Sequence, residues 1–231
     1  MNQKVLVKTE NSVAIIVISH PPVNSLCLEV RKGLLDALET ADNDSGVLAI
    51  VIKGAGKTFP VGADIKEFDL PPQAPYLPHI CERIENCSKP VIIALHGTAL
   101  GGGFEIALAG HYRVATSETR VGFPEVHLGL LPGAGGTQRL PRLAGVEASI
   151  GMISSGLPID MAQAIKLGVI DALVEDLDQS LINFVSNIIE SDCRIRRTRD
   201  NLEKILNSKE NKALLSEARK NISKGIKTLL A

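Results

Sequence analysis

The stretch that decides the fold lies in the middle of the chain and reads Gly97-Thr98-Ala99-Leu100-Gly101-Gly102-Gly103-Phe104-Glu105. An apolar run of strand length, Val91 to Leu95, precedes it, and apolar residues of helical character follow it. Three consecutive glycines let the backbone approach a bound group closely. The free N–H groups and the positive dipole end of the following helix suit a negatively charged oxygen. The sequence therefore predicts a strand, a glycine turn and a helix that together can bind an anionic oxygen.

Two carboxylates are expected close to this turn. Glu105 falls in the first turn of the predicted helix, and Glu125 follows Pro124 at the end of a predicted strand or loop. Anion-stabilising amides beside two proton carriers are the parts that acid–base chemistry next to a carbonyl group requires. Taken singly, each feature also has a structural explanation, namely close helix–strand packing for the glycines and ordinary helix-terminal or surface positions for the acids.

Buried strands and helices alternate along the chain. Val47 to Ile52 is a continuous apolar run that leads into a glycine-bearing loop at 54–59, and a helix follows; the same order recurs at Val91. Such repetition indicates an α/β fold of layered strand–helix units. Further helices are expected at 28–41, 79–87, 137–143, 148–154, 161–167 and 177–190, and further strands at 13–19 and 112–115.

Composition bounds the class of protein. The 231 residues are 45% apolar with a mean hydropathy of +0.15, enough for one sizeable core and without an apolar run of the roughly 18 residues that span a bilayer. The N-terminus has no signal-peptide pattern. No metal-type pairing joins the four cysteines, so we expect reduced thiols and a cytoplasmic location; these are Cys27, Cys81, Cys87 and Cys193.

Charge is distributed unevenly. The net charge of −1 combines +6 over residues 191–231 with −7 over residues 1–190. Leucines and isoleucines recur among the tail's charges at roughly helical spacing, which favours a pair of amphipathic helices over an arm that binds nucleic acid. We expect a core of residues 1–190 and a helical C-terminal segment of residues 191–231.

Several other site motifs fail on spacing. Gly56-Lys57-Thr58 lacks the glycine that a P-loop requires five residues earlier, because position 51 is valine. Gly133-Ala134-Gly135 lacks the last glycine of a dinucleotide fingerprint, because position 138 is glutamine. The histidines form no His-Glu-x-x-His pattern, and no serine lies in a Gly-x-Ser-x-Gly elbow. We therefore expect neither a metal nor a separate cofactor.

The pieces together resemble the crotonase, or enoyl-CoA hydratase/isomerase, superfamily. The matching segments follow one another in order over residues 4–190: Pro22-Val23-Asn24-Ser25-Leu26, Gly62-Ala63-Asp64-Ile65-Lys66, Ala99 to Glu105, Gly122 to Glu125 and Gly129 to Leu140. The resemblance implies a crotonase-like spiral of ββα units and an oxyanion hole formed by the amides of Ala63 and Gly102. It also implies that CoA is bound along Val61, Gly62, Asp64, Ile65 and Lys66, with Lys57 as a further candidate.

The resemblance implies an enoyl-CoA hydratase of fatty-acid β-oxidation. Glu105 would activate water, and Glu125 would supply a proton to C2 of a trans-2-enoyl-CoA; CoA is then part of the substrate. One alternative is a Δ3,Δ2-enoyl-CoA isomerase, alone or as a second activity, which needs a single carboxylate. Another is a non-catalytic or RNA-binding module with the same fold. The presence of both acids favours the hydratase.

Three more segments are similar to the hydratase half of multifunctional β-oxidation enzymes, namely Cys87 to Pro90, His111 to Ala115 and Arg196 to Asp200. The chain lacks their dehydrogenase half, and it stops short of the C-terminal helices of a stand-alone hydratase. We expect a homo-oligomer, a trimer or a dimer of trimers, if the chain is complete, because monomers seldom expose large apolar surfaces. Otherwise we expect part of a larger multifunctional enzyme. No nucleic-acid or membrane partner is expected.

Overall fold

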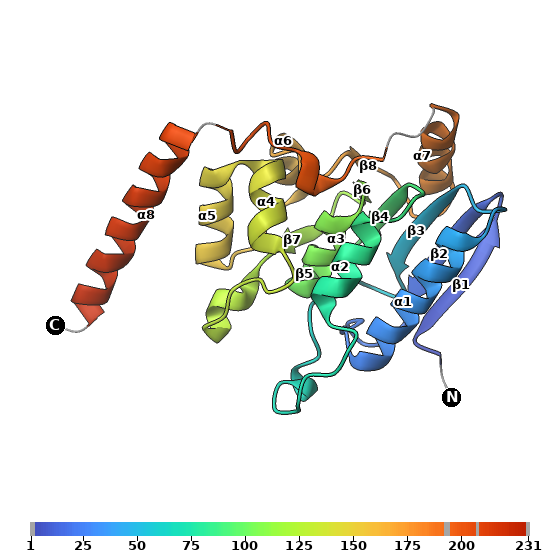
Figure 1. Ribbon diagram of the computed structural model, residues 1–231, viewed down its shortest axis with the longest axis horizontal. Coiled ribbons are helices and arrows are strands. Elements are labelled where there is room, and N and C mark those ends of the chain that lie inside the picture. Colours follow the sequence, from blue (N-terminus) through green and yellow to red (C-terminus); the bar gives the residue numbers. More distant parts are fainter. Residues whose placement is uncertain (1–2, 192–194, 207, 230–231) are drawn as a thin grey trace.

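A six-stranded sheet forms the centre of the computed structural model, which describes residues 3–191, 195–206 and 208–229 (Figure 1). Its strands run in the order β1-β2-β3-β4-β6-β8, with β1 antiparallel to β2 and all other neighbours parallel. Their bounds are β1 (Val5–Glu10), β2 (Val13–Ile18), β3 (Ala49–Gly54), β4 (Val91–Leu95), β6 (Tyr112–Ala115) and β8 (Ala172–Leu173). A separate pair, β5 (Thr98–Leu100) and β7 (Arg120–Gly122), is also parallel.

Helices cover both faces of the sheet, as the apolar strand runs predict. Alternate residues of β3 point to opposite sides, so Ile50 and Ile52 join one hydrophobic core while Ala49 and Val51 join a second. The larger core lies beneath α1 (Leu28–Asn43), α2 (Leu77–Glu85) and α3 (Gly102–Ala109). The smaller one lies beneath α7 (Gln179–Glu190). The predicted α/β layering is confirmed.

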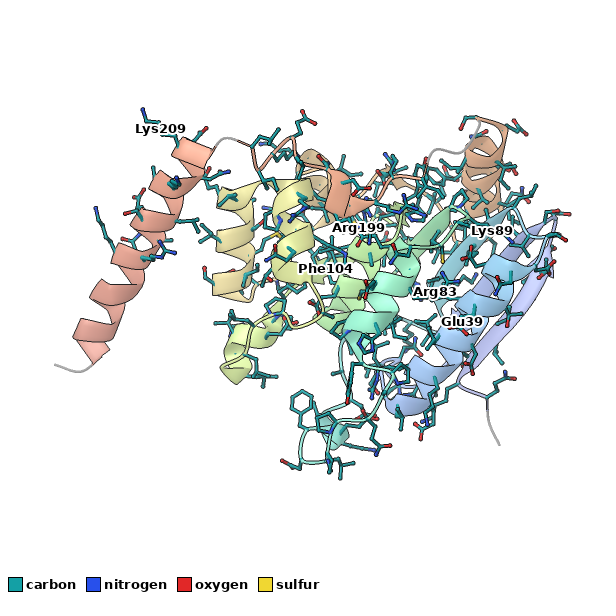
Figure 2. The ribbon with its side chains drawn as sticks, viewed as in Figure 1. Glu39, Arg83, Lys89, Phe104, Arg199 and Lys209 are labelled. Atoms are coloured by element: carbon teal, nitrogen blue, oxygen red, sulfur yellow. The ribbon has the colours of Figure 1, made fainter. Side chains whose placement is uncertain are left out.

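The C-terminal half is mostly helical. It contains α4 (Gly136–Ala144), α5 (Val146–Ser155), α6 (Met161–Lys166) and the long α8 (Ser208–Leu229). In Figure 1, α8 extends away from the sheet on the far side of α5, which it contacts. Figure 2 contrasts Phe104, deep in the body, with Lys209 on the protruding helix. None of the helices in the described ranges is long and apolar enough to cross a membrane.

The prediction of two helices in the C-terminal segment, residues 191–231, is wrong. Residues 195–206 form a loop with one short 3₁₀ turn, η3 (Thr198–Asp200), and α8 is the one helix that follows in the described part of the tail. The cause is tertiary: Thr198 is buried, its hydroxyl donates to the Leu108 carbonyl at 2.9 Å, and Arg196 pairs with Asp171 at 2.8 Å. This segment therefore packs against the rest of the protein and does not form an α-helix. Cys193 lies outside the described residues.

Asn24 closes the loop between β2 and α1. It has a left-handed φ of 55°, which asparagine tolerates better than most residues, and it is 2% exposed. Its side-chain amide donates to the carbonyls of Ala55 and Thr58, both at 2.8 Å, and its oxygen accepts from the His20 amide at 2.8 Å. The loop that contains His20 and the loop at 55–58 thus meet on one side chain.

Asn24→Ala should lower the free energy of unfolding by about 2–4 kcal/mol, because it removes three hydrogen bonds and leaves buried backbone groups unpaired. Urea denaturation followed by circular dichroism measures the change. Asn43→Ala is the matched control, because Asn43 is exposed at the end of α1 and the same substitution there should change stability by no more than about 0.5 kcal/mol. Equal effects of the two substitutions would contradict the role given to Asn24.

Candidate active site

The glycine turn leads into α3, as the sequence predicts, but a short strand that was not predicted, β5, lies between this turn and the predicted strand β4. Gly101 has φ 52° and ψ −127°, a conformation open to glycine and strained for other residues, and its amide donates to the Gly122 carbonyl at 3.0 Å. A Cβ at this position would lie 3.1 Å from Oε1 of Glu125. The turn is therefore shaped so that the backbone passes close to the Glu125 carboxyl and enters α3 immediately afterwards.

Two backbone amides lie side by side at this turn. A Cβ built on Gly102 would be 3.8 Å from the Ala63 nitrogen, and one built on Gly62 would be 3.9 Å from the Gly102 nitrogen. Within the described residues, neither the Ala63 nor the Gly102 amide donates to a protein acceptor. Such paired donors can bind one oxygen that develops negative charge.

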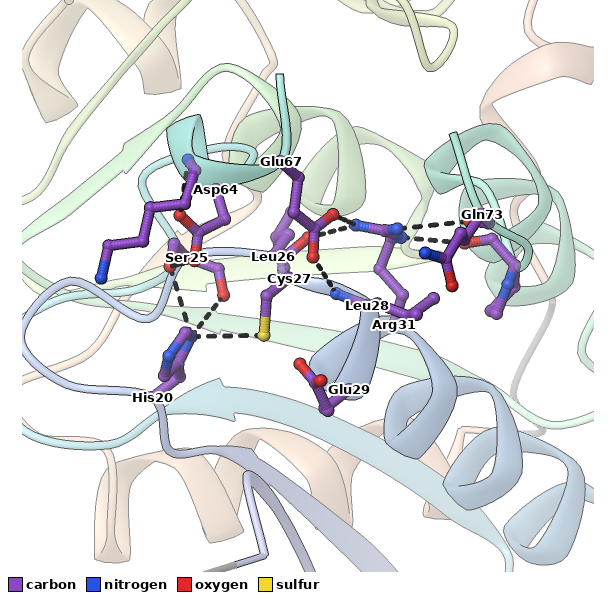
Figure 3. A network of polar contacts seen from close by, with 12 residues as sticks. His20, Ser25, Leu26, Cys27, Leu28, Glu29, Arg31, Asp64, Glu67 and Gln73 are labelled. Atoms are coloured by element: carbon purple, nitrogen blue, oxygen red, sulfur yellow. Dashed lines mark hydrogen bonds and ion pairs between the residues drawn. The ribbon is translucent and has the colours of Figure 1, made fainter. Parts of the chain in front are cut away.

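The loop that carries Ala63 is anchored to the beginning of α1 (Figure 3). Asp64 accepts from the Lys66 amide at 3.1 Å and from the Ser25 hydroxyl at 3.1 Å. A few residues later, Glu67 forms an ion pair with Arg31 of α1 at 2.7 Å. Because side chains tie the loop at both ends of its short 3₁₀ turn, η1 (Ile65–Glu67), the Ala63 amide is held in a defined place.

Glu105 lies in the first turn of α3, as predicted, and is 2% exposed. One of its oxygens, Oε1, accepts from the amides of Ala134 and Gly136 at 2.6 and 2.8 Å. Burial raises the pKa of Glu105, while these two amides and the nearby charge of Arg139 act in the opposite direction. The Glu105 carboxylate is thus oriented by the loop at residues 134–136. The two donors in this loop lie 29 and 31 residues after Glu105 in the sequence.

Glu125 has a different environment. It lies in a 3₁₀ turn, η2 (Pro124–Leu128), whereas the sequence suggested a strand or loop end. Its Oε2 atom is buried and has no hydrogen-bond partner within the described residues. Desolvation, reinforced by the negative charge of Glu105, raises the pKa of Glu125 to about 7. Both carboxyls therefore have a raised pKa, but their surroundings differ: two amides orient Glu105, whereas Oε2 of Glu125 accepts from no described residue. Two carboxyls in unlike surroundings are the arrangement expected of an acid–base pair.

A cavity of about 390 Å³ brings the predicted groups together. Ala63, Gly102, Glu105 and Glu125 all line it, and so do Val61, Gly62 and Ile65. Asp64 lines an adjoining cavity of about 590 Å³ that shares Ala63, Phe68, Leu77 and Leu130 with the first. Lys57 and Lys66 are exposed and line neither cavity. The roles of these residues in CoA binding stay predictions.

One cluster has the side chains of a metal site. His20, Cys27 and Asp64 present possible ligand atoms within 4.8 Å of one another. The Lys4 ammonium lies 3.2 Å from the Cys27 sulfur, and His20 Nδ1 contacts the Ser25 carbonyl at 3.0 Å. A positive charge beside the sulfur opposes a bound cation, so we assign no metal to this cluster.

Comparison with known proteins decides the family. The family description that matches the chain is "Enoyl-CoA hydratase/isomerase", and the match covers residues 8–228. The chain belongs to this family. Among solved structures, the enoyl-CoA hydratase from Bacillus anthracis superimposes on this family member with a TM-score of 0.76 at 28% identity, covering 94% of this chain and 90% of that one. The crotonase-like fold class is confirmed.

Two curated relatives from the enoyl-CoA hydratase/isomerase family differ in how much of their own length matches this chain. The peroxisomal bifunctional enzyme of Danio rerio is 47% identical over 166 residues, which are 72% of this chain and 23% of the relative. The probable enoyl-CoA hydratase of Bacillus subtilis is 42% identical over 171 residues, 71% of this chain and 66% of the relative. The chain spans about a quarter of the length of the bifunctional relatives that it matches.

Two features of the site in this family member were not predicted from its residues. The amides that orient Glu105 come from Ala134 and Gly136, in a glycine-rich segment whose spacing does not fit a dinucleotide site and gives no other sign of contact with Glu105. Leu77 of α2 reaches the oxyanion turn, where its Cδ2 lies 2.5 Å from the position of a Cβ on Gly102. The proline-rich segment before α2 gave no signal that this helix contributes to the cavity.

Proposed function

We propose that this chain catalyses the addition of water to a trans-2-enoyl-CoA thioester, giving the 3-hydroxyacyl-CoA in fatty-acid β-oxidation. The observation that carries the proposal is the pairing of two unlike carboxyls, Glu105 and Glu125, with two free amides around one cavity. Family membership supports the substrate class, since relatives are named as enoyl-CoA hydratases and bifunctional enzymes.

The amides of Ala63 and Gly102 would donate to the thioester oxygen. Their hydrogen bonds withdraw electrons from the conjugated double bond, so C3 becomes electrophilic and the enolate oxygen that forms is stabilised. Glu105, oriented by the amides of Ala134 and Gly136, would take a proton from water as the water oxygen bonds to C3. Glu125 would then give its proton to C2 from the same side, completing a syn addition. No electron is gained or lost overall, so the reaction requires no redox cofactor.

The direct test is the hydration of crotonyl-CoA, followed by the loss of the conjugated enoyl absorbance. A purified chain that fails to hydrate short, medium or long trans-2-enoyl-CoA substrates would overturn the proposal and favour a non-catalytic module.

A Δ3,Δ2-enoyl-CoA isomerase is the second candidate. Glu125 favours it, because a carboxyl with a pKa of about 7, whose buried Oε2 has no hydrogen-bond partner in the described part of the chain, can carry a proton between C2 and C4 by itself. Conversion of a 3-enoyl-CoA to the conjugated 2-enoyl isomer, measured on the same preparation, tests this activity.

Association with further protein is part of the proposal. Several large apolar side chains are exposed around η2 and the end of α5, and we propose that a second copy of the chain or an additional domain covers them; these are Val126, Leu128, Leu130, Leu131 and Leu157.

The pH dependence of hydration should carry the signature of Glu125. Below about pH 7 its carboxyl holds the proton that C2 needs, and above that pH the proton is lost, so kcat/KM should fall as pH rises through about 7. At lower pH, protonation of Glu105 removes the base, which gives a second, acid limb that belongs to the coupled pair. Initial rates between about pH 5 and pH 9 measure both limbs. An alkaline limb that is absent would contradict the assignment of Glu125 as the acid.

A further inference from the structure

A buried ion pair lies behind the loop that orients Glu105. Arg139 of α4 donates from Nη2 and Nε to Oε2 of Glu85 in α2, at 2.8 and 3.2 Å. The two side chains are only 11% and 2% exposed. Neither of them lines the cavity that contains Glu105 and Glu125. Because burying a charge pair is costly, a pair in this position calls for a role other than substrate contact.

The pair connects to Glu105 through a single residue. Arg139 donates from Nη1 to the Ala134 carbonyl at 3.0 Å, and the Ala134 amide donates to Glu105 at 2.6 Å. Gly135, with a left-handed φ of 99°, wraps the loop around the guanidinium so closely that a Cβ there would collide with Arg139. The position of the loop therefore depends on where Arg139 is held.

Glu85 is itself fixed from the other side. Its Oε1 atom accepts from the Arg199 amide at 2.8 Å, and its backbone carbonyl accepts from Arg197 Nε at 3.1 Å. The Glu85 carboxylate thus accepts hydrogen bonds both from Arg139 of α4 and from the segment at 197–199. The second contact fixes the carboxylate in place, and the carboxylate in turn fixes Arg139.

We propose that Arg139, held by Glu85, is a positioning residue for the hydration reaction and fixes the loop whose two amides aim the Glu105 carboxylate at the attacking water. This inference rests on the proposed function. It extends that function to two residues that do not line the cavity of Glu105 and Glu125 and that act through the loop.

Electrostatics gives the proposal a distinct readout. The positive charge of Arg139 lowers the pKa of Glu105 against the effect of burial. Removing that charge should therefore raise the pKa of Glu105 and move the acid limb of the pH profile to higher pH. A residue that only stabilised the fold would leave this limb in place.

Arg139→Gln is the first test, with crotonyl-CoA as the substrate. The loss of loop position should lower kcat about 10–100-fold while KM stays within about twofold, because Arg139 does not line the cavity. Arg142→Gln is the matched control: Arg142 lies on the same helix, is half-buried, and donates to the Gln138 and Arg199 carbonyls without a hydrogen bond to Glu85 or to the loop at 134–136. It should keep the parental kcat and acid limb. Parental values in both variants would overturn the proposal.

A second variant covers the case in which Arg139→Gln fails to fold with Glu85 left unpaired. The double substitution Glu85→Gln with Arg139→Gln removes both charges together and should show the same fall in kcat. A folded double variant with the parental kcat and acid limb would overturn the proposal.

Titration of the Glu105 carboxyl by ¹³C NMR, assigned with Glu105→Gln, separates this inference from the proposed function. If the parent chain does not hydrate crotonyl-CoA, the proposed function fails. The NMR titration of Glu105 in the parent, in Arg139→Gln and in the double variant still shows whether Arg139 changes the pKa of the Glu105 carboxyl. An unchanged titration midpoint in both variants would exclude that action.

Discussion

Glu105→Gln should lower kcat for hydration about 10²–10⁴-fold, the usual contribution of a general acid–base group. The substitution is well suited to the site, because the glutamine oxygen can still accept from the amides of Ala134 and Gly136. The loop at 134–136 should therefore keep its position, while the base that takes a proton from water is lost. Steady-state rates on crotonyl-CoA, together with an unchanged unfolding midpoint, measure the effect. A variant with near-parental kcat would show that another group activates the water.

The same substitution separates the two candidate activities. Isomerisation needs one carboxyl that shuttles a proton, and Glu125 has a buried oxygen, Oε2, that accepts no hydrogen bond from the residues the structure describes. Glu105→Gln should therefore spare conversion of a 3-enoyl-CoA relative to hydration, whereas Glu125→Gln should abolish most of both. Loss of both activities in Glu105→Gln would contradict this division.

Gly102→Pro should raise the barrier for hydration by about 3–4 kcal/mol, the scale of a lost oxyanion-hole donor. Gly102 is the first residue of α3, where proline fits the helix geometry but has no N–H to donate. The thioester oxygen would then be bound by the Ala63 amide alone. The measurement is kcat/KM on crotonyl-CoA.

Gly102→Ala is the control that isolates the missing amide. Any Cβ at position 102 lies 2.5 Å from Cδ2 of Leu77, so both substitutions displace that flexible side-chain end in the same way. Only the proline removes the donor. If the two folded variants lost activity equally, crowding at Leu77 would account for the loss, and the placement of the oxyanion hole at Gly102 would be wrong.

The strands and helices of the centre could be predicted because their signal is local. The apolar run at Val91 and the glycines at 101–103 specify a buried strand, a turn and a helix without reference to the rest of the chain. The first strand, Val5–Glu10, was missed because five of its six residues are exposed at the sheet edge, so it lacks a buried face that alternation could reveal.

The candidate site was predictable only in part. Glu105 and Glu125 were found because carboxylates near a glycine turn have a chemical meaning, and the structure brings them to one cavity. Their raised pKa values were not predictable, since these depend on tertiary burial and on amides that other segments supply. The prediction of two helices in the C-terminal tail was wrong for the same reason. Side-chain contacts of Thr198 and its neighbours override the helical spacing of the apolar residues.

The hydrogen bond between Glu85 and the Arg199 amide has a consequence for the order in which the protein matures during synthesis. The two residues are 114 positions apart, so Glu85 emerges from the ribosome long before its last partner. Until residue 199 is out, one oxygen of a carboxylate that ends up buried must remain hydrated by water. The sheet and its glycine turns can assemble earlier, because all their strands precede residue 174. A nascent chain should therefore acquire its overall shape first and a rigid Glu105 only after residue 199 has been synthesised.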